Sequence, residues 1–249
     1  MTGAPPTTSP PIPVGARFAV AIDGPAGAGK SVLGAALSAA IGATYIDSGI
    51  AYRAVTWDAL ESGLDLDDDA TLAPRASTLP LTIEPPHHAD GRQFTVTVAG
   101  RDVTWALRSP EVDNAVSRPS ALPGVRAAVT DLLRRLASTG RVVMVGRDIG
   151  TVVLPHATLK VWVTATSTTR AERRVAELHA RGVDADPGAI HAGIVARDTL
   201  DSSRATAPSR AAPDAIVIET DAMTIDEEVA AATLALAARL VHANRGENS

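Results

Sequence analysis

The sequence contains no cysteine and no apolar run long enough to cross a membrane. Without cysteine the chain has no disulfides, no thiolate zinc site and no cysteine nucleophile. A transmembrane helix needs about 20 consecutive apolar residues, so we expect no membrane partner. The N-terminal segment MTGAPPTTSPPIPVGAR has neither a basic start nor an apolar stretch, and we therefore expect no signal peptide and a cytoplasmic location.

Basic charge is also scarce. The 249 residues carry 23 Lys and Arg against 28 Asp and Glu, a net charge of −5, and the only lysines are Lys30 and Lys160. A chain with this balance is not built to bind a nucleic-acid polymer. Any anionic small molecule must instead be held by a local cluster of cations. Hydrophobic residues at 45% and charged residues at 20% are typical of a globular domain, and we expect a monomer.

The order of apolar segments indicates the fold class. We predict a disordered proline-rich tail over 1–16 and one domain over 17–249. Strands are predicted at 18–23, 43–47, 141–146, 159–164 and 215–220. Helices are predicted at 30–41, 50–62, 167–181 and 187–200, after Pro123, and after a capping box at 224–227. Strands that alternate with helices favour an α/β fold, a five-stranded parallel sheet flanked by helices. Within 64–117 the pattern changes to that of small antiparallel strands, which we interpret as an α/β insertion.

Residues 24–31 read GPAGAGKS and match the phosphate-binding pattern G-x-x-x-x-G-K-[ST] between a strand and a helix. Glycines let the backbone amides wrap a polyphosphate, and the N-terminus of the next helix favours the same anion. In such a loop Lys30 reaches the β- and γ-phosphates and the Ser31 hydroxyl binds Mg²⁺. Val32 stands where a dinucleotide fingerprint needs its third glycine. The loop therefore predicts a nucleoside triphosphate site.

Three further clusters predict where the phosphate acceptor binds. DSGIAYR (47–53) and GRDIGT (146–151) each follow a predicted strand, at the sheet edge where open α/β sheets bind ligands. Arg197, Asp201 and Arg204 are spaced i, i+4, i+7 and so share one helical stripe. Each cluster alone also fits an ordinary surface ion pair. Together they favour a second, anionic ligand.

The segments GPAGAGKS, DSGIAYR, GRDIGTVV and RDTLDSSRATAP occur in an order and spacing that resemble bacterial cytidylate (CMP/dCMP) kinases, which are P-loop nucleoside monophosphate kinases. The resemblance covers residues 18–239, and its last two motifs are far more specific than the P-loop. It implies a five-stranded P-loop sheet with an NMP-binding insertion near 64–117 and a short helical lid near 165–210. It also implies transfer of the γ-phosphate of ATP to CMP or dCMP, with Mg²⁺ as cofactor.

The same resemblance implies a role for each matched residue. ATP would be bound by Gly24, Pro25, Ala26, Gly27, Ala28, Gly29, Lys30, Ser31 and Val32. The acceptor phosphate would be held by Arg53 and Arg147, the cytosine ring by Ser48, Arg126, Asp148 and Arg204, and the sugar by Ser117, Arg197 and Asp201. Lid arginines that would neutralise the moving phosphate are Arg170, Arg173 and Arg174. The catalytic set is then Lys30, Arg147, Asp148, Arg173 and Arg174.

One position departs from the family pattern. The family usually has an acidic residue two positions before the arginine of GRD, and this chain has Val145. Because the other motif residues are present, we interpret the site as an active one. Two alternatives stay open: a P-loop kinase for another small acceptor, such as UMP, AMP or a metabolite, and a nucleotide-binding protein with weak turnover. A GTPase switch is disfavoured because no guanine-reading N-K-x-D sequence occurs.

Overall fold

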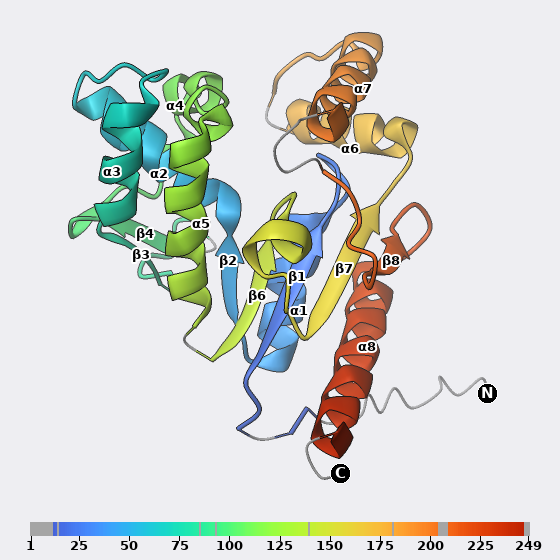
Figure 1. Ribbon diagram of the computed structural model, residues 1–249. Coiled ribbons are helices and arrows are strands. Elements are labelled where there is room, and N and C mark those ends of the chain that lie inside the picture. Colours follow the sequence, from blue (N-terminus) through green and yellow to red (C-terminus); the bar gives the residue numbers. More distant parts are fainter. Residues whose placement is uncertain are drawn as a thin grey trace. The chain divides into compact units, whose positions relative to one another are not determined.

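The computed structural model describes residues 12–13, 15–84, 86–92, 94–138, 140–180, 182–203 and 209–246, without the side chains of 200, 201, 203 and 243–246. The chain forms two compact units (Figure 1). The first unit combines Met1–Tyr45 with Gly140–Ser249, and the second is Ile46–Thr139.

A parallel sheet organises the first unit, and its central strand leads into the P-loop. Its strands are ordered β2-β6-β1-β7-β8, with bounds β1 (Phe18–Asp23), β2 (Thr44–Asp47), β6 (Arg141–Val145), β7 (Leu159–Thr164) and β8 (Ile216–Glu219). On β1, Ile22 is paired in parallel with Val145 of β6 on one side and Val161 of β7 on the other. The five predicted strands are confirmed to within one residue at each end. Because the chain passes from β1 to β2 and β6 on one side of it and later to β7 and β8 on the other, the carboxyl end of β1 is a topological switch point, where such sheets bind ligands.

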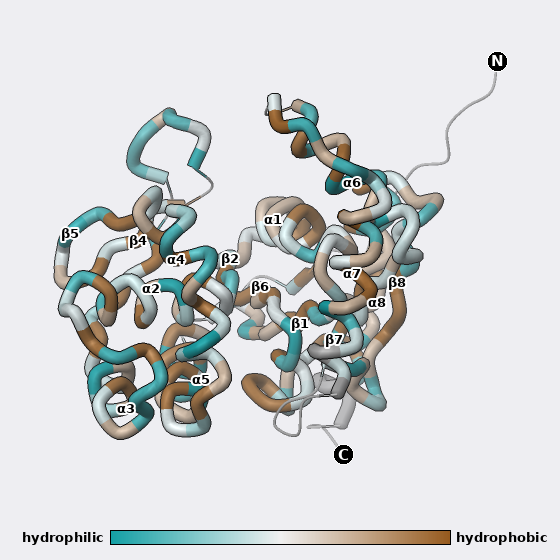
Figure 2. Tube along the Cα trace, turned by 90° about the horizontal axis from the view of Figure 1, so that it is seen from above, coloured by the Kyte–Doolittle hydropathy of each residue, from teal (hydrophilic) through white to brown (hydrophobic). Residues whose placement is uncertain are grey.

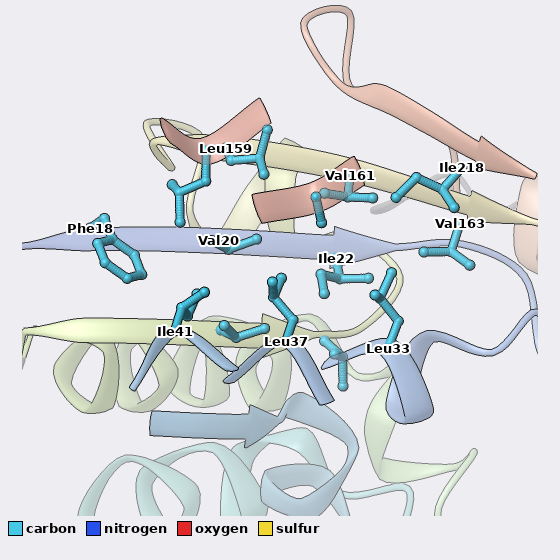
Figure 3. Close-up of a cluster of buried hydrophobic side chains, with 14 of the residues drawn as sticks. Phe18, Val20, Ile22, Leu33, Leu37, Ile41, Leu159, Val161, Val163 and Ile218 are labelled. Carbon is cyan, nitrogen blue, oxygen red and sulfur yellow. The ribbon is translucent and has the colours of Figure 1, made fainter. Parts of the chain in front are cut away.

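The strands are almost continuously apolar because helices cover both faces of a parallel sheet. Helices α1 (Lys30–Ile41) and α8 (Ile225–Gly246) pack against one another in this unit. Figure 3 shows the resulting core, in which side chains from β1, α1, β7 and β8 meet. It contains Phe18, Val20, Ile22, Leu33, Leu37, Ile41, Leu159, Val161, Val163 and Ile218. The P-loop thus directly follows a strand whose side chains belong to this core.

Helices α6 (Ser167–Ala180) and α7 (Pro187–Ser203) pack against each other in the first unit. The Asp186 side chain accepts the Gly188 amide at 2.9 Å and so caps the start of α7 as predicted. Before α8, the Glu227 carboxylate accepts the Thr224 amide at 2.8 Å, and the Thr224 hydroxyl accepts the Glu227 amide at 3.4 Å. This reciprocal pair is the predicted capping box, and it is confirmed.

A short element after β6 was not predicted. Residues Ile149–Val153 form a single π-helical turn, η3, in which the Asp148 carbonyl accepts the Val153 amide at 3.2 Å and the Ile149 carbonyl accepts the Leu154 amide at 2.6 Å. Such turns are rare and occur often at functional sites. Because apolar Ile, Gly and Val make up the turn, the sequence reads equally well as a strand extension.

The second unit joins helices to a small antiparallel sheet. Its helices are α2 (Ser48–Glu61), α3 (Asp69–Thr78), η1 (Ala106–Arg108), α4 (Pro110–Ala115), η2 (Pro119–Ala121) and α5 (Pro123–Ala137). The sheet, ordered β3-β4-β5, consists of β3 (Leu81–Glu84), β4 (Thr95–Val98) and β5 (Arg101–Asp102). Helices α3 and α5 pack on each other, and both alternate between hydrophobic and hydrophilic residues (Figure 2). The antiparallel strands were predicted within 64–117, and the compact unit also contains α2 and α5.

Of the predicted tail, residues 1–11 and 14 lie outside the described residues. The part that is described packs on the core: Ile12 and Ala16 contact the apolar cluster. The Arg141 guanidinium donates to the carbonyls of Pro13 at 2.9 Å and Ala16 at 3.1 Å. Packing of the first unit therefore begins at Ile12, before the predicted start at Arg17. Within the described ranges, no helix is both long and apolar enough to cross a membrane.

Candidate active site

The P-loop begins with a glycine that no other residue can replace. Gly24 has φ 152°, and a Cβ atom built there would lie 2.0 Å from the Val163 carbonyl oxygen of β7. Gly27 and Gly29 have φ 78° and 97°, the left-handed region that favours glycine. The turn from β1 into α1 is therefore made by glycine backbone pressed against the neighbouring strand.

Two carbonyls of the loop are held by donors from elsewhere in the first unit. The Arg170 guanidinium donates to the Ala26 carbonyl at 3.0 Å, and the Thr220 hydroxyl donates to the Ala28 carbonyl at 3.2 Å. In a planar trans peptide the carbonyl and the following amide point in opposite directions. The amides of Gly27 and Gly29 consequently face away from these donors. Backbone amides turned this way can line an anion-binding concavity.

Lys30 and Ser31 stand at the start of α1. The Lys30 ammonium donates to the Pro25 carbonyl at 2.7 Å, across the mouth of the loop. Ser31 is exposed, and the first turn of α1 has no acidic residue. A helix N-terminus with this composition favours an anion. Lys30 would exchange the carbonyl for a phosphate oxygen when a nucleotide binds.

The arginines of α6 have three different environments. Arg170 is buried and makes two hydrogen bonds to the Asp198 carboxylate of α7, at 3.0 and 2.5 Å. Arg173 donates to the Thr220 hydroxyl and carbonyl at 2.9 and 2.7 Å and lies beside the P-loop. Arg174 is exposed and pairs with Glu177 of its own helix. Arg170 therefore supports the loop by direct contact, and of the other two arginines it is Arg173 that lies beside the loop.

Residues 146–151, GRDIGT, form what we call the GRD turn. A buried carboxylate attaches this turn to β1, the strand that leads into the P-loop. Asp23, the last residue of β1, accepts the amides of Ile149 at 2.8 Å and Gly150 at 2.7 Å. The pKa of Asp23 is raised from 3.8 to about 6. Burial, the largest cause, and the Asp148 charge raise this pKa, while the two amides and Lys30 lower it. Asp148 is also buried, and its side chain does not cap the turn that follows it.

Val145 is part of the apolar core. It is 2% exposed, and one of its methyl carbons would lie 2.5 Å from a Cβ atom built on Gly34. A carboxylate at this position would lose its water on packing against α1. The strand end is thus apolar here, and the buried carboxylates at this edge are Asp23 and Asp148.

The remaining predicted acceptor residues belong to the second unit. Ser48 is buried at the start of α2. Arg53 pairs with Asp113 of α4 and donates to the Leu107 carbonyl at 3.1 Å. Arg126 of α5 lies 5.6 Å from the Tyr52 ring centroid and donates to the Ser120 carbonyl at 3.1 Å. Ser117 is exposed just after α4. These cations are held by neighbours in the described structure and would have to change partner to bind a phosphate or a base.

Of the third cluster, Arg197 lies exposed on α7. The side chain of Asp201 and the whole of Arg204 lie outside the described residues.

The family model for cytidylate kinase matches residues 20–238. The chain belongs to the cytidylate kinase family. A cytidylate kinase of Chloroflexus aggregans is 48% identical over 211 residues, 85% of this chain and 90% of the relative. A cytidylate kinase of Herpetosiphon aurantiacus is 45% identical over 217 residues, 87% of this chain and 93% of the relative. The resemblance drawn from the four motifs is confirmed.

Three residues of this cytidylate kinase family member were missed by the sequence analysis. Asp23 accepts an amide of the GRD turn, and Thr220 donates to a carbonyl of the P-loop. Asp198 pairs with Arg170, which supports the P-loop. Asp23 is the last residue of an apolar strand and Thr220 lies at the end of another, whereas Asp198 is the second residue of the RDTLDSSRATAP motif but was given no role. Their partners are 126 residues away for Asp23, 192 for Thr220 and 28 for Asp198. No local pattern could have found these contacts.

Proposed function

We propose that this protein transfers the γ-phosphate of ATP to CMP or dCMP, giving ADP and CDP or dCDP. The observation that carries the proposal is the phosphate loop of the first unit, joined through Asp23 to the GRD turn of the specific family motif. The loop expected to bind the donor and the turn expected to bind the acceptor are thereby both attached to the end of β1. Phosphoryl transfer depends mainly on such positioning and on charge stabilisation.

The donor side has the groups that the reaction needs. Amides of Gly27 and Gly29 face away from the donors that hold the loop, and Lys30 stands at its mouth. Charge that develops on the moving phosphoryl group is stabilised by Lys30 and by Arg173. Arg174 enters this set only if it leaves Glu177. Donors arranged before the reaction avoid the cost of reorganising water in the transition state.

The residues also fit Mg²⁺ bound together with ATP. The exposed hydroxyl of Ser31 is a hard oxygen ligand of the kind that Mg²⁺ prefers. Within the described part of the chain, no group of three or more His, Cys, Asp or Glu side chains is placed to hold a metal by itself. Mg²⁺ usually takes one or two protein ligands and completes its shell with phosphates and water. Ser31 would hold the ion, which when bound would neutralise charge on the β- and γ-phosphates.

On the acceptor side, the choice of base is assigned to Asp148. Cytosine has an exocyclic amine, a donor, where uracil has a carbonyl, an acceptor, and an ionised carboxylate offers acceptors alone. Asp148 therefore matches cytosine. Arg126 donates to the acceptor edge of the ring, Ser48 and Arg204 complete the base site, and Arg53 and Arg147 bind the phosphate. Ser117, Arg197 and Asp201 take the sugar.

The test is a measurement of ADP formation with a panel of acceptors at fixed MgATP. We expect kcat/KM to be highest for CMP and dCMP and at least tenfold lower for UMP and AMP. A preference for another nucleotide, or for a non-nucleotide acceptor, would support the alternative of a different P-loop kinase. Tight ATP binding with no turnover on any acceptor would support a nucleotide-binding protein.

A further inference from the structure

Asp23 is enclosed at the end of the central strand of the sheet. It is 4% exposed, it ends the central strand β1, and the next residue is Gly24, whose backbone presses on the Val163 carbonyl of β7. On the other side, Ile22 is paired with Val145 of β6. The carboxylate is therefore buried at the end of a strand that has a paired neighbour on each side.

Each oxygen of this carboxylate accepts one buried amide of η3. Oδ1 accepts the Ile149 amide at 2.8 Å, and Oδ2 accepts the Gly150 amide at 2.7 Å. The first amides of a helical turn have no partner within the turn. The residue before η3, Asp148, would ordinarily cap it but does not. Asp23, which belongs to β1, caps η3 instead. The Asp148 side chain is therefore not used for capping.

We propose that Asp23 is a positioning residue for phosphoryl transfer, which holds the GRD turn, and with it Arg147 and Asp148, at a fixed place beside the P-loop. The inference rests on the proposed function, because it takes Arg147 and Asp148 as acceptor-binding residues. Asp23 touches neither substrate. It acts through Arg147 and Asp148, the two residues that come before Ile149.

The protonation state of Asp23 matters for this role. A protonated carboxyl group presents an O–H to one of two amides that both donate, so one hydrogen bond is lost. Burial brings the pKa of Asp23 to about 6, so protonation occurs just below neutral pH. The charged groups that face it are Lys30 at the start of α1, Asp148 before η3, and Lys160 of β7, whose ammonium pairs with Asp214.

The experiment compares wild type with Asp23→Asn. The asparagine amide can accept one backbone amide, but its NH₂ group faces the other. At pH 7.5 we expect kcat/KM for CMP to fall at least tenfold. We expect the Kd of a non-hydrolysable ATP analogue to change less than threefold, and the melting temperature not to fall. Asp68→Asn is the matched control, since Asp68 caps α3 through Thr71 on the exposed surface; it should leave all three values unchanged.

The pH profile separates positioning from a purely structural role. Phosphate groups of both nucleotides also titrate near pH 6, so the quantity to follow is the ratio of wild-type to Asp23→Asn kcat/KM. This ratio should fall towards one as the pH decreases through about 6, because the protonated wild type resembles the variant. Asp23→Ser, which keeps one acceptor without a charge, provides the same comparison if the asparagine variant does not fold.

Three outcomes would overturn the inference. They are unchanged kcat/KM for CMP in the variant, equal losses of CMP turnover and ATP-analogue binding, and a ratio that does not depend on pH. Failure of the proposed function is recognised separately, because the wild-type protein would then phosphorylate neither CMP nor dCMP.

Discussion

Asp23 and Asp69 make the same pair of hydrogen bonds in the two units of the chain. Asp69, at the start of α3, accepts the amides of Gly124 at 2.8 Å and Val125 at 2.9 Å, where α5 begins. Asp23 does the same for η3. In both cases a carboxylate from one element caps another, and the capped segment adjoins a residue predicted to bind the base, Arg126 or Asp148.

The settings of the two carboxylates differ. Asp69 is partly exposed and so keeps some contact with water, whereas Asp23 is buried beside Asp148 and Lys30. Burying a carboxylate costs free energy unless hydrogen bonds and cations compensate for it. Burial of the Asp23 carboxylate therefore costs free energy in the first unit, and the partly exposed Asp69 carboxylate of the second unit avoids this cost. Strained or costly groups are retained in proteins mainly at functional positions.

The comparison predicts that Lys30 in the first unit mainly affects the rate and that Arg53 in the second unit mainly affects acceptor affinity. Lys30→Ala should lower kcat by on the order of 10²–10³-fold, as the loss of one preorganised donor does elsewhere, with little change in melting temperature. Arg53→Ala should mainly raise KM for CMP. Steady-state kinetics on both variants, with both substrates varied, checks this. Equal effects on kcat and KM in the two variants would erase the distinction between the units.

A second prediction concerns the choice of base. Asp148→Asn should narrow the CMP/UMP preference by roughly 10- to 100-fold, because a charge-assisted hydrogen bond of about 1.5–3 kcal/mol is lost for cytosine and the new amide can donate to the uracil carbonyl. Arg126→Met is the matched variant in the second unit. It should reduce kcat/KM for both nucleotides alike, since both bases carry the same ring carbonyl. An unaltered CMP/UMP ratio in Asp148→Asn would remove Asp148 from base recognition.

The buried charge of Asp23 also predicts how stability varies with pH. The pKa is about 6 in the folded chain and 3.8 as the ordinary value. Between these values the folded state binds the proton more readily, so this contribution to stability is complete below pH 3.8 and is lost as the pH rises through 6. Asp23→Asn should therefore gain about 2 kcal/mol relative to wild type between pH 4 and 7. Urea unfolding at several pH values measures this, and a constant difference would contradict it.

The last prediction compares two ion pairs, one in each unit. Asp198→Asn leaves the buried Arg170 guanidinium without its carboxylate and should cost about 1–3 kcal/mol. Asp113→Asn breaks the more exposed pair with Arg53 in the second unit and should cost less than about 1 kcal/mol. Because it also releases Arg53, it should lower KM for CMP. Thermal unfolding and CMP titration of both variants provide the test.

Much of the first unit could be predicted from local patterns. Short apolar strands, the glycine loop and the capping box at Thr224 each depend on residues close together in sequence, so their structures follow from spacing alone. The supporting contacts could not be predicted in this way. From the sequence alone, Arg170 could be either a lid cation or a support for the P-loop. Its contacts with Ala26 and Asp198, which indicate the second role, are known only from the structure. Asp23 is read as a strand end until the η3 amides are placed beside it.

The second unit was less predictable for a related reason. Its antiparallel strands alternate clearly, but α4 spans six residues and lies between two short 3₁₀ turns. Pieces this short have too few turns to show helical periodicity. Arg53 and Arg126 were identified by motif, yet their present partners, Asp113 and Tyr52, depend on how α2 packs within the unit.

Gly34 makes the sizes of two residues interdependent. A glycine inside α1 costs about 0.8–1 kcal/mol of helix propensity relative to alanine, but an alanine here would meet a Val145 methyl carbon at 2.5 Å and the Tyr45 ring at 2.9 Å. Gly34→Ala alone is therefore harmful, and Val145→Ala alone leaves a cavity. Combined, each substitution relieves the defect of the other, and the Tyr45 ring needs only a slight turn. In evolutionary terms this is reciprocal sign epistasis: a single-site mutational scan would discard both changes, and only a paired library would recover them.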